Sequence, residues 1–191
     1  MAKIIGFLGG PSTGKTTLAQ SVLKVLTLQG KNAAWANEFV SEDVARIGAP
    51  TPEFYIYEQY RYVLMQYRRE RKLAATHDFV LTDAPLLLGY AYALQNTPNP
   101  YCARQQKLRE DFVTLFHQDA HNYDHLYLLN RETTFENNGI RFHSEEQSLA
   151  YDALLKSMLD DAGVTYTFIS GTVEERTHKV LADITKTAAA A

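Results

Sequence analysis

The order of apolar and polar positions along the chain predicts alternating strands and helices. Apolar, β-rich runs are predicted to form strands over residues 3–8, 33–37, 79–82, 125–129 and 164–170. Between the first two runs, Leu18, Val22, Val25 and Leu26 recur at helical spacing, and Gly30 supplies a stop. The first three elements are therefore strand, loop and helix.

Later helices are marked by their start signals. They are predicted over residues 52–75, 85–94 and 103–121 and after Ser144 and Thr172. Ser144 with Gln147, and Thr172 with Glu175, have the spacing of capping boxes. Strands that alternate with helices, without hairpin signals, favour an α/β fold with a mostly parallel five-stranded sheet and helices on both faces.

Length and charge set the class of protein. The chain has 191 residues, 46% of them apolar, and a net charge of −3, so we expect one domain over residues 1–191 without a strong attraction to DNA or anionic lipid. No run approaches the roughly 20 apolar residues of a membrane span, and we expect no membrane partner. A lone cysteine, Cys102, excludes an internal disulfide and is typical of a cytoplasmic protein. Nothing in the sequence predicts an oligomeric state.

The segment GGPSTGKT, residues 9–16, has the spacing of a phosphate-binding loop between a strand and a helix. Glycines let the backbone wrap with its N–H groups turned toward phosphate oxygens, and the helix adds its positive dipole end. Lys15 is expected to reach the β- and γ-phosphates, Thr16 to ligate Mg²⁺, and Thr17 to lie near the α-phosphate. The predicted nucleotide-binding residues are Gly9, Gly10, Pro11, Ser12, Thr13, Gly14, Lys15, Thr16 and Thr17.

Asp83 follows the third predicted strand and is the best partner for Thr16 at the metal, either directly or through water. In a parallel sheet the ligand lies at the carboxyl ends of the strands, which is where Asp83 should be. An alternative is that Asp83 caps the helix that opens at Pro85, and one carboxylate can do both.

With these residues in place, the chain resembles the P-loop kinases related to thymidylate and ribosylnicotinamide kinases, including the small ATPases grouped with the latter. In that group an acidic residue follows the second strand, an aspartate ends the third, and a lid carries an arginine in a D-G-x-R pattern. Here Glu38, Asp83 and the segment Asn138-Gly139-Ile140-Arg141 take those positions. The resemblance implies a three-layer P-loop kinase fold, a lid over about residues 130–143, and ATP as the phosphoryl donor.

The chain also departs from that pattern. Asn138 stands where the lid aspartate is usual, and Asp83-Ala84 stands where many nucleotide kinases have an Asp-Arg pair. These departures argue against thymidylate kinase activity in particular and leave phosphoryl transfer intact.

The resemblance implies roles for three charged residues. Glu38 is the candidate base or orienter of the acceptor hydroxyl, because a carboxylate accepts the proton as the nucleophile attacks. Arg141 would close over the transferring phosphoryl group, and Arg131, at the entrance of the lid, is a second candidate. The alternatives are a solvated turn residue for Glu38 and surface salt bridges for the two arginines.

The helix predicted after Pro52 is rich in tyrosine. Tyr57, Tyr60, Leu64 and Tyr67 share one helical face, for which core packing is the favoured interpretation. Core packing explains only part of this set, and tyrosines of the helix that do not pack in the core are candidates for stacking on a planar base, with Gln66 hydrogen-bonding to the edge of that base. Related kinases use this region for the acceptor. The candidate substrate contacts are Glu38, Tyr60, Gln66 and Arg69.

A basic cluster ends the same helix, formed by Arg68, Arg69, Arg71 and Lys72. Its ordinary explanation is a solvated face with favourable charge at a helix C-terminus. A sharper interpretation is a patch for a phosphate of the acceptor or for a nucleic-acid backbone. Trp35, in the second strand, is expected in the core.

Three functions remain open at this point. The first is a kinase that phosphorylates a hydroxyl of a nucleoside- or nucleotide-like metabolite. The second keeps this chemistry but acts on a hydroxymethylated base in DNA, as in viral base hypermodification. The third is a nucleotide-dependent switch or binding module that hydrolyses the triphosphate slowly.

Overall fold

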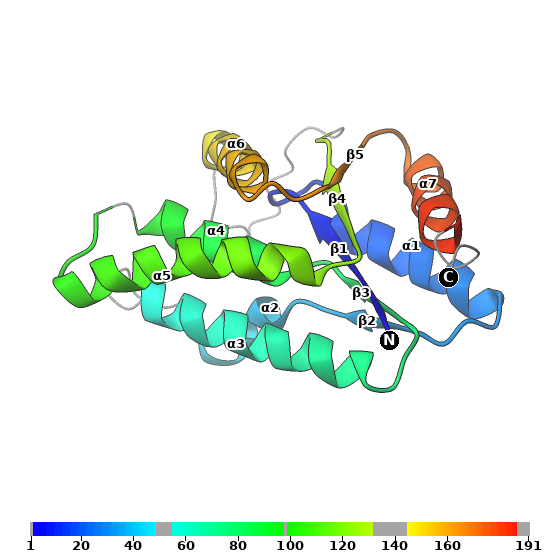
Figure 1. Cartoon of the computed structure of the whole chain (residues 1–191), viewed down its shortest axis with the longest axis horizontal. Helices are drawn as coiled ribbons and strands as arrows, with labels where there is room; N and C mark the ends of the chain where they lie inside the picture. The colour runs from blue at the N-terminus through cyan, green and yellow to red at the C-terminus, as the bar shows by residue number, and fades with distance from the viewer. Residues whose placement is uncertain (1, 49–54, 98, 132–144, 187–191) are drawn as a thin grey trace.

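The computed structural model describes residues 2–48, 55–97, 99–131 and 145–186. Its five strands form one sheet in which every pairing is parallel, with the order β2-β3-β1-β4-β5 (Figure 1). The strands are β1 (Lys3–Leu8), β2 (Ala33–Ala36), β3 (Phe79–Thr82), β4 (His125–Leu129) and β5 (Thr167–Ile169). The central strand, β1, leads into the phosphate loop at its carboxyl end.

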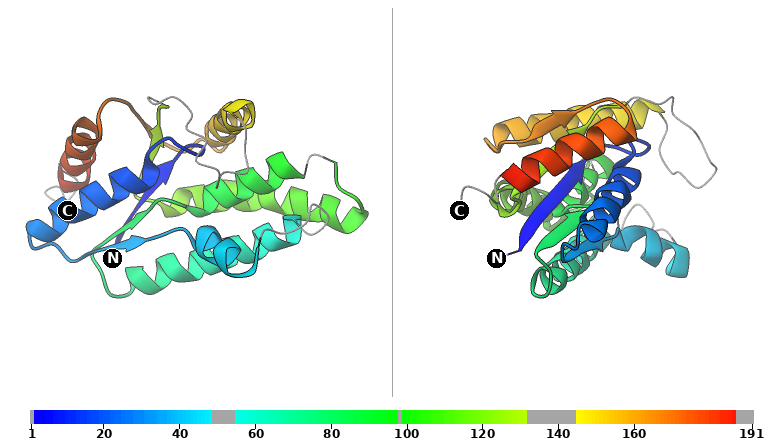
Figure 2. Two further views of the ribbon diagram at one scale, coloured as in Figure 1. Left: turned by 180° about the vertical axis from the view of Figure 1, so that it is seen from behind. Right: turned by 90° about the vertical axis from the view of Figure 1, so that its right-hand side faces the viewer.

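Helices connect these strands and cover both faces of the sheet. They are α1 (Lys15–Leu28), α2 (Phe39–Ile47), α3 (Tyr55–Ala74), α4 (Leu86–Asn96), α5 (Ala103–Asp119), α6 (Glu145–Asp161) and α7 (Val173–Lys186), with a short 3₁₀ helix at Ala120–Asn122. Figure 2 shows α1 and α7 side by side on one face of the sheet. The expected three-layer α/β fold is confirmed.

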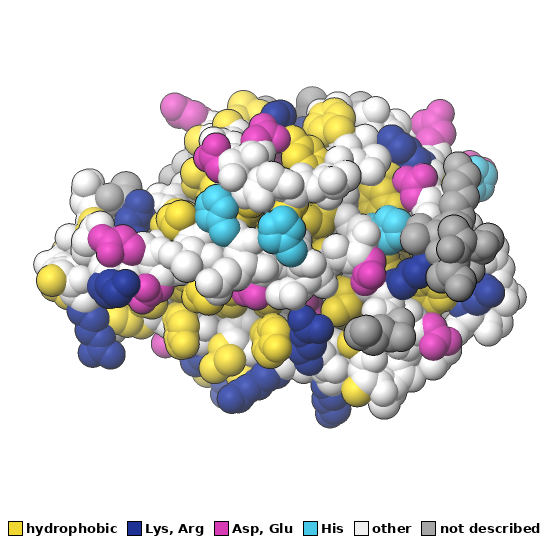
Figure 3. Space-filling model, in the orientation of Figure 1, with side chains coloured by type: hydrophobic (Ala, Val, Ile, Leu, Met, Phe, Trp, Pro, Cys, Tyr) yellow, Lys and Arg dark blue, Asp and Glu magenta, His cyan; other side chains and the backbone are white. Residues whose placement is uncertain are grey.

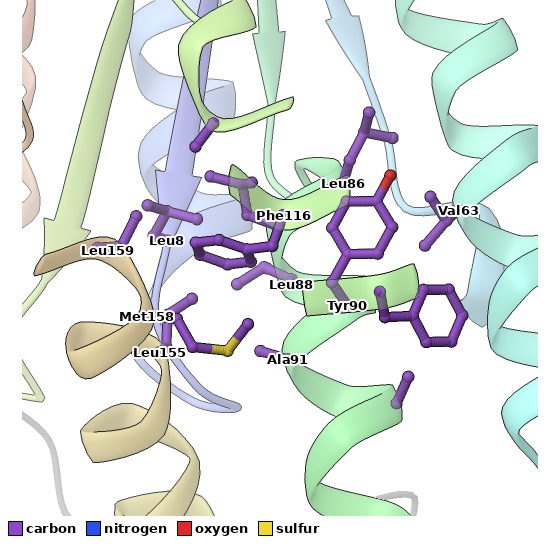
Figure 4. Packing of buried hydrophobic residues seen from close by; sticks show 14 of the residues in the cluster. Leu8, Val63, Leu86, Leu88, Tyr90, Ala91, Phe116, Leu155, Met158 and Leu159 are labelled. Atoms are coloured by element: carbon purple, nitrogen blue, oxygen red, sulfur yellow. The ribbon is translucent and has the colours of Figure 1, made fainter. Parts of the chain in front are cut away.

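Two hydrophobic cores lie on the two faces of the sheet because side chains alternate along each strand. Leu126 and Leu128 of β4 point into the core beneath α4, α5 and α6, whereas Tyr127 and Leu129 join the core beneath α1 and α7. Figure 4 shows the first core, where side chains from α4, α5 and α6 meet those of β1. Packing in both cores fixes the position of the carboxyl edge of the sheet, where β1 leads into the phosphate loop.

Most predicted elements are confirmed, with differences at their ends. β3 and β4 have the predicted bounds, while β5 is shorter than the predicted run of residues 164–170. Helix α2 was not predicted, although Val40, Val44 and Ile47 recur at helical spacing along it. The capping box of α7 is confirmed: the Thr172 N–H donates to Glu175 Oε2 at 2.7 Å, and the Glu175 N–H donates to Thr172 Oγ1 at 3.3 Å. Ser144 lies outside the described residues.

The predicted core face of α3 is wrong for three of its four residues, while Tyr57 is partly buried and packs against the core. Tyr60, Leu64 and Tyr67 are 49%, 39% and 41% exposed. The buried side chains of α3 are Ile56, Gln59, Tyr62, Val63, Gln66 and Glu70. Three of these six are polar or charged, so the pattern of apolar residues selected the wrong face. In the described part of the chain, no helix is long and apolar enough to span a membrane.

Candidate nucleotide site

The loop between β1 and α1 has the backbone of a phosphate-binding nest. Its φ angles are positive at Gly9 (136°), Ser12 (69°) and Gly14 (89°). Glycine adopts such angles without a steric cost, whereas Ser12 is a non-glycine residue held in the left-handed region. Successive residues in such conformations turn N–H groups to one side and form a concave anion site.

Lys15 begins α1, and its ammonium group folds back over this loop. Nζ donates to the carbonyl oxygens of Gly9 and Gly10, at 2.8 Å each. Burial lowers the pKa of Lys15, and the carboxylates of Glu38, Asp83 and Asp152 oppose that effect in this order. Carboxylates from three separate segments therefore oppose the effect of burial on the pKa of one lysine.

Thr16 and Asp83 join the loop to the end of β3. Thr16 Oγ1 donates to Asp83 Oδ2 at 2.5 Å, and the indole Nε1 of Trp35 donates to Asp83 Oδ1 at 3.1 Å. The Asp83 residue is only 4% exposed. A hydroxyl and a carboxylate in contact are hard oxygen donors of the kind that Mg²⁺ prefers, with phosphate and water completing its shell. These two residues fit the predicted metal.

Asp152 and Arg131 brace the loop from the side of α6. Asp152 Oδ1 accepts a hydrogen bond from the Gly10 N–H at 2.5 Å, and its Oδ2 accepts one from Arg131 Nη2 at 2.7 Å. Arg131 Nη1 also donates to the Pro11 carbonyl at 2.6 Å. Asp152 was not predicted, because no local pattern distinguishes it from other polar residues of α6.

Arg176 of α7 supports the loop from the other side, and it too was missed. Its guanidinium donates to the carbonyl oxygens of Thr13 and Asn130, at 3.0 Å each, and to that of Gly171 at 2.8 Å. The side chain is almost completely buried. One arginine therefore ties the loop to the ends of β4 and β5, so the loop keeps its shape through tertiary contacts.

Comparison with known protein families assigns the chain to one of them. A family model described as AAA domain matches residues 4–176, which is most of the chain. The chain belongs to this AAA domain family. A search of curated proteins gave no significant match.

Solved structures show that this member of the AAA domain family has the fold of P-loop kinases. The NadR protein in complex with NAD and AMP-PNP matches with a TM-score of 0.69 and 16% identity, covering 97% of this chain and 49% of that chain. NadR in complex with NR gives 0.69 and 19%, covering 89% and 46%. Thymidylate kinase from Candida albicans gives 0.63 and 13%, covering 98% and 92%. This chain spans about half the length of the NadR chains.

Glu38 stands between β2 and α2 of this AAA domain. Its carboxylate accepts a hydrogen bond from the Ser41 hydroxyl one turn into α2. Burial raises the pKa values of Tyr92 in α4 and Tyr151 in α6, and the charge of Glu38 adds to both effects. Glu38 thus contributes to the pKa shifts of Lys15, Tyr92 and Tyr151.

The other predicted substrate residues have different surroundings. Gln66 is buried: its Oε1 accepts from the Phe39 N–H at 3.0 Å and its Nε2 lies 3.4 Å from Thr82 Oγ1. Arg69 contacts Asn37 and Glu42, while Tyr60 packs near Phe112 of α5. Arg141, Asn138 and residues 132–143 of the predicted lid lie outside the described residues.

Proposed function

We propose that this protein is an ATP-dependent kinase that transfers the γ-phosphoryl group to a hydroxyl of a nucleoside- or nucleotide-like acceptor. The observation that carries the proposal is the place of Glu38 and Asp83, which follow β2 and β3 at the edge of the sheet where β1 leads into the phosphate loop. A simple triphosphate switch needs Lys15, Thr16 and Asp83. A carboxylate after the second strand is the additional group that a kinase requires for its acceptor.

The donor side of the reaction uses the loop. Its N–H groups and Lys15 would hold the β- and γ-phosphates, while Thr16 and Asp83 would hold Mg²⁺. When bound, the ion neutralises charge on the phosphate oxygens. Lys15 leaves the carbonyl oxygens of Gly9 and Gly10 to contact these phosphates, so its present hydrogen bonds keep the ammonium in the loop before nucleotide binds.

The acceptor side would use Glu38. Its carboxylate takes the proton of the acceptor hydroxyl while the oxygen bonds to the γ-phosphorus. The bond from that phosphorus to the bridging oxygen breaks, and ADP leaves. Tyr92 and Tyr55 are our candidates for aromatic walls on this side: Tyr92 stacks on Tyr151, and Asn96 donates to the Tyr55 hydroxyl at 3.1 Å. These flat, partly polar surfaces suit a nucleoside. Arg141 would supply a further positive charge over the phosphoryl group.

Two of the similar solved structures support a small nucleoside-like acceptor. NadR binds NR in one of the similar structures, and another is a thymidylate kinase. The acidic net charge gives no support to a DNA substrate. A cytoplasmic location is part of the same proposal.

The test compares Glu38→Gln with Glu42→Gln as a matched control in helix α2. With ATP, Mg²⁺ and a nucleoside panel, the wild-type protein should form a phosphorylated product. Glu38→Gln should lower acceptor turnover by about 10²-fold or more with unchanged ATP affinity, because general base catalysis contributes about 10²–10⁴-fold. Glu42→Gln should retain turnover.

Other outcomes would separate the alternatives. Product formed only on hydroxymethylated DNA would assign the base-modifying kinase. ATP hydrolysis without any acceptor product, unchanged in Glu38→Gln, would assign the switch and contradict the proposal.

A further inference from the structure

A groove of about 440 Å³ lies at the open edge of the sheet, between the end of β2 and the second half of α3. Its walls include Trp35, Phe39, Met65, Arg68, Arg69 and Lys72. Figure 3 shows dark-blue and yellow side chains alternating along the lower edge of the molecule, where Figure 1 places α3. The volume is in the range of about 300–1,000 Å³ that is typical of small-molecule sites.

Among the residues that the structure describes, two of the three positive charges in this groove have no ionic partner. Arg69 is paired with Glu42 at 2.8 Å and stacks on Phe39, its Cζ 5.5 Å from the ring centroid. Arg68 and Lys72, in contrast, make no ion pair with any residue that the structure describes. They are four positions apart on α3, where like charges repel at a cost of about 0.2–0.5 kcal/mol. The groove therefore keeps a positive charge available for an anion.

The aromatic wall of the groove is Trp35. Its indole edge is fixed by the hydrogen bond to Asp83. Phe39 already carries Arg61 and Arg69 against its ring, at 5.9 and 5.5 Å from its centroid, which leaves Trp35 as the aromatic surface for a ligand. A planar ring beside two cations is the recognition chemistry of a base with a phosphate.

This groove is separate from the acceptor position described above. Asn37 and Phe39 line it, whereas Glu38 between them is not among its lining residues. Neighbouring residues of an extended segment point to opposite sides. Glu38 thus faces away from the groove, and Trp35 links the groove to Asp83 through its Nε1 hydrogen bond.

We propose that this groove is a second nucleotide site, which takes a free nucleoside phosphate with its phosphate on Arg68 and Lys72 and its base against Trp35. The site goes beyond the proposed kinase activity and does not rest on it. Since Trp35 also holds Asp83, a ligand in the groove contacts the residue that orients the metal-binding carboxylate.

Trp35 is the single tryptophan of the chain, so its fluorescence reports on the groove. The phosphate loop is first saturated with AMP-PNP and Mg²⁺, and AMP is then titrated. Wild-type protein should give a saturable change in fluorescence, and calorimetry should count a further AMP per chain. Arg68→Ser/Lys72→Ser should weaken AMP binding by about tenfold or more, since each 1.4 kcal/mol is tenfold. Its circular dichroism and ATP binding should be unchanged.

Arg71→Ser is the matched control, because Arg71 is on the same helix, stacks on Tyr67 instead, and is not among the groove residues. It should bind AMP like the wild type. An equal loss of AMP affinity in Arg71→Ser and in the double variant would show that the effect comes from the overall positive charge of α3. That result would overturn the proposal. The same holds if AMP gives no signal in the wild-type protein, or if inorganic pyrophosphate binds as tightly as AMP.

Discussion

The hydroxyl of Thr16 donates a hydrogen bond of 2.5 Å to the carboxylate of Asp83, although the two residues are 67 positions apart in the sequence. β1 and β3 are neighbours in the sheet, so the loop after one strand meets the residue after the other. The other oxygen of Asp83 is held by Trp35 of β2. Three parallel strands thus build the corner at which we propose that Mg²⁺ binds.

Replacement of Asp83 should separate metal use from nucleotide binding. Asp83→Asn keeps an oxygen for Thr16 but removes the negative charge. We expect a higher Mg²⁺ requirement and a fall in turnover of about 10²-fold or more, as when a preorganised electrostatic group is lost. A Mg²⁺ titration of ATP turnover measures both.

The control for this prediction is Asp78→Asn, an exposed aspartate just before β3. It should leave the Mg²⁺ dependence as it is. An Asp83→Asn protein with the wild-type Mg²⁺ profile would contradict the assigned role.

The ion pair between Arg131 and Asp152 should contribute to stability because it is largely shielded from water. The two side chains are 11% and 26% exposed and lie 2.7 Å apart. A double-mutant cycle with Arg131→Gln and Asp152→Asn, followed by urea unfolding, should give a coupling free energy of about 1–3 kcal/mol. The exposed pair of Lys107 and Asp111 should give less than about 0.5 kcal/mol. Equal couplings for the two pairs would refute the bracing role.

Glu70 should make the stability fall as the pH rises. Burial raises its pKa from 4.5 to about 7, although Thr82, Tyr123 and Gln66 give it hydrogen bonds that favour the charged form. The folded state then binds a proton that the unfolded state has lost between pH 4.5 and 7. The free energy of unfolding therefore decreases across this window, by roughly 3 kcal/mol in total.

Glu70→Gln tests this effect, because glutamine keeps the shape but has no proton to lose. The difference in unfolding free energy between variant and wild type should move in favour of the variant as the pH rises from 4.5 to 7. A difference that stays constant over this range would show that Glu70 does not titrate there.

Gly89 marks a close contact between α3 and α4. A Cβ at this position would lie 2.5 Å from Cγ2 of Val63, a buried and stiff side chain. Gly89→Ala should destabilise the protein through overpacking, by about 1–3 kcal/mol, less the gain of about 1 kcal/mol in helix propensity. Adding Val63→Ala should recover part of the loss in thermal unfolding. A stabilised Gly89→Ala protein would contradict the close packing.

The loop and the element order were predictable because their signals are local. GGPSTGKT carries its spacing within eight residues, and the bounds of β3 and β4 follow from short apolar runs with polar ends. Glu38 and Asp83 could be proposed because each follows a strand, and parallel strands end at one edge. Their chemical roles stay predictions.

The buried face of α3 could not be read in the same way. Gln59, Gln66 and Glu70 are buried because other segments supply partners for them, such as the Phe39 N–H for Gln66 and the Tyr123 hydroxyl for Glu70. A polar residue in a sequence carries no sign of such a partner. For this reason the sequence pattern favours the opposite face of α3, which carries the tyrosines, as the core face.

The sequence by itself determined a nucleotide-binding loop and an alternating α/β order, because both depend on residues that are neighbours along the chain. Only the tertiary structure decided which charges surround the loop. Asp152 and Arg176 reach it from helices that follow more than a hundred residues later. Their positions depend on how α6 and α7 pack against the sheet, which is set by burial of two whole faces and not by any local pattern.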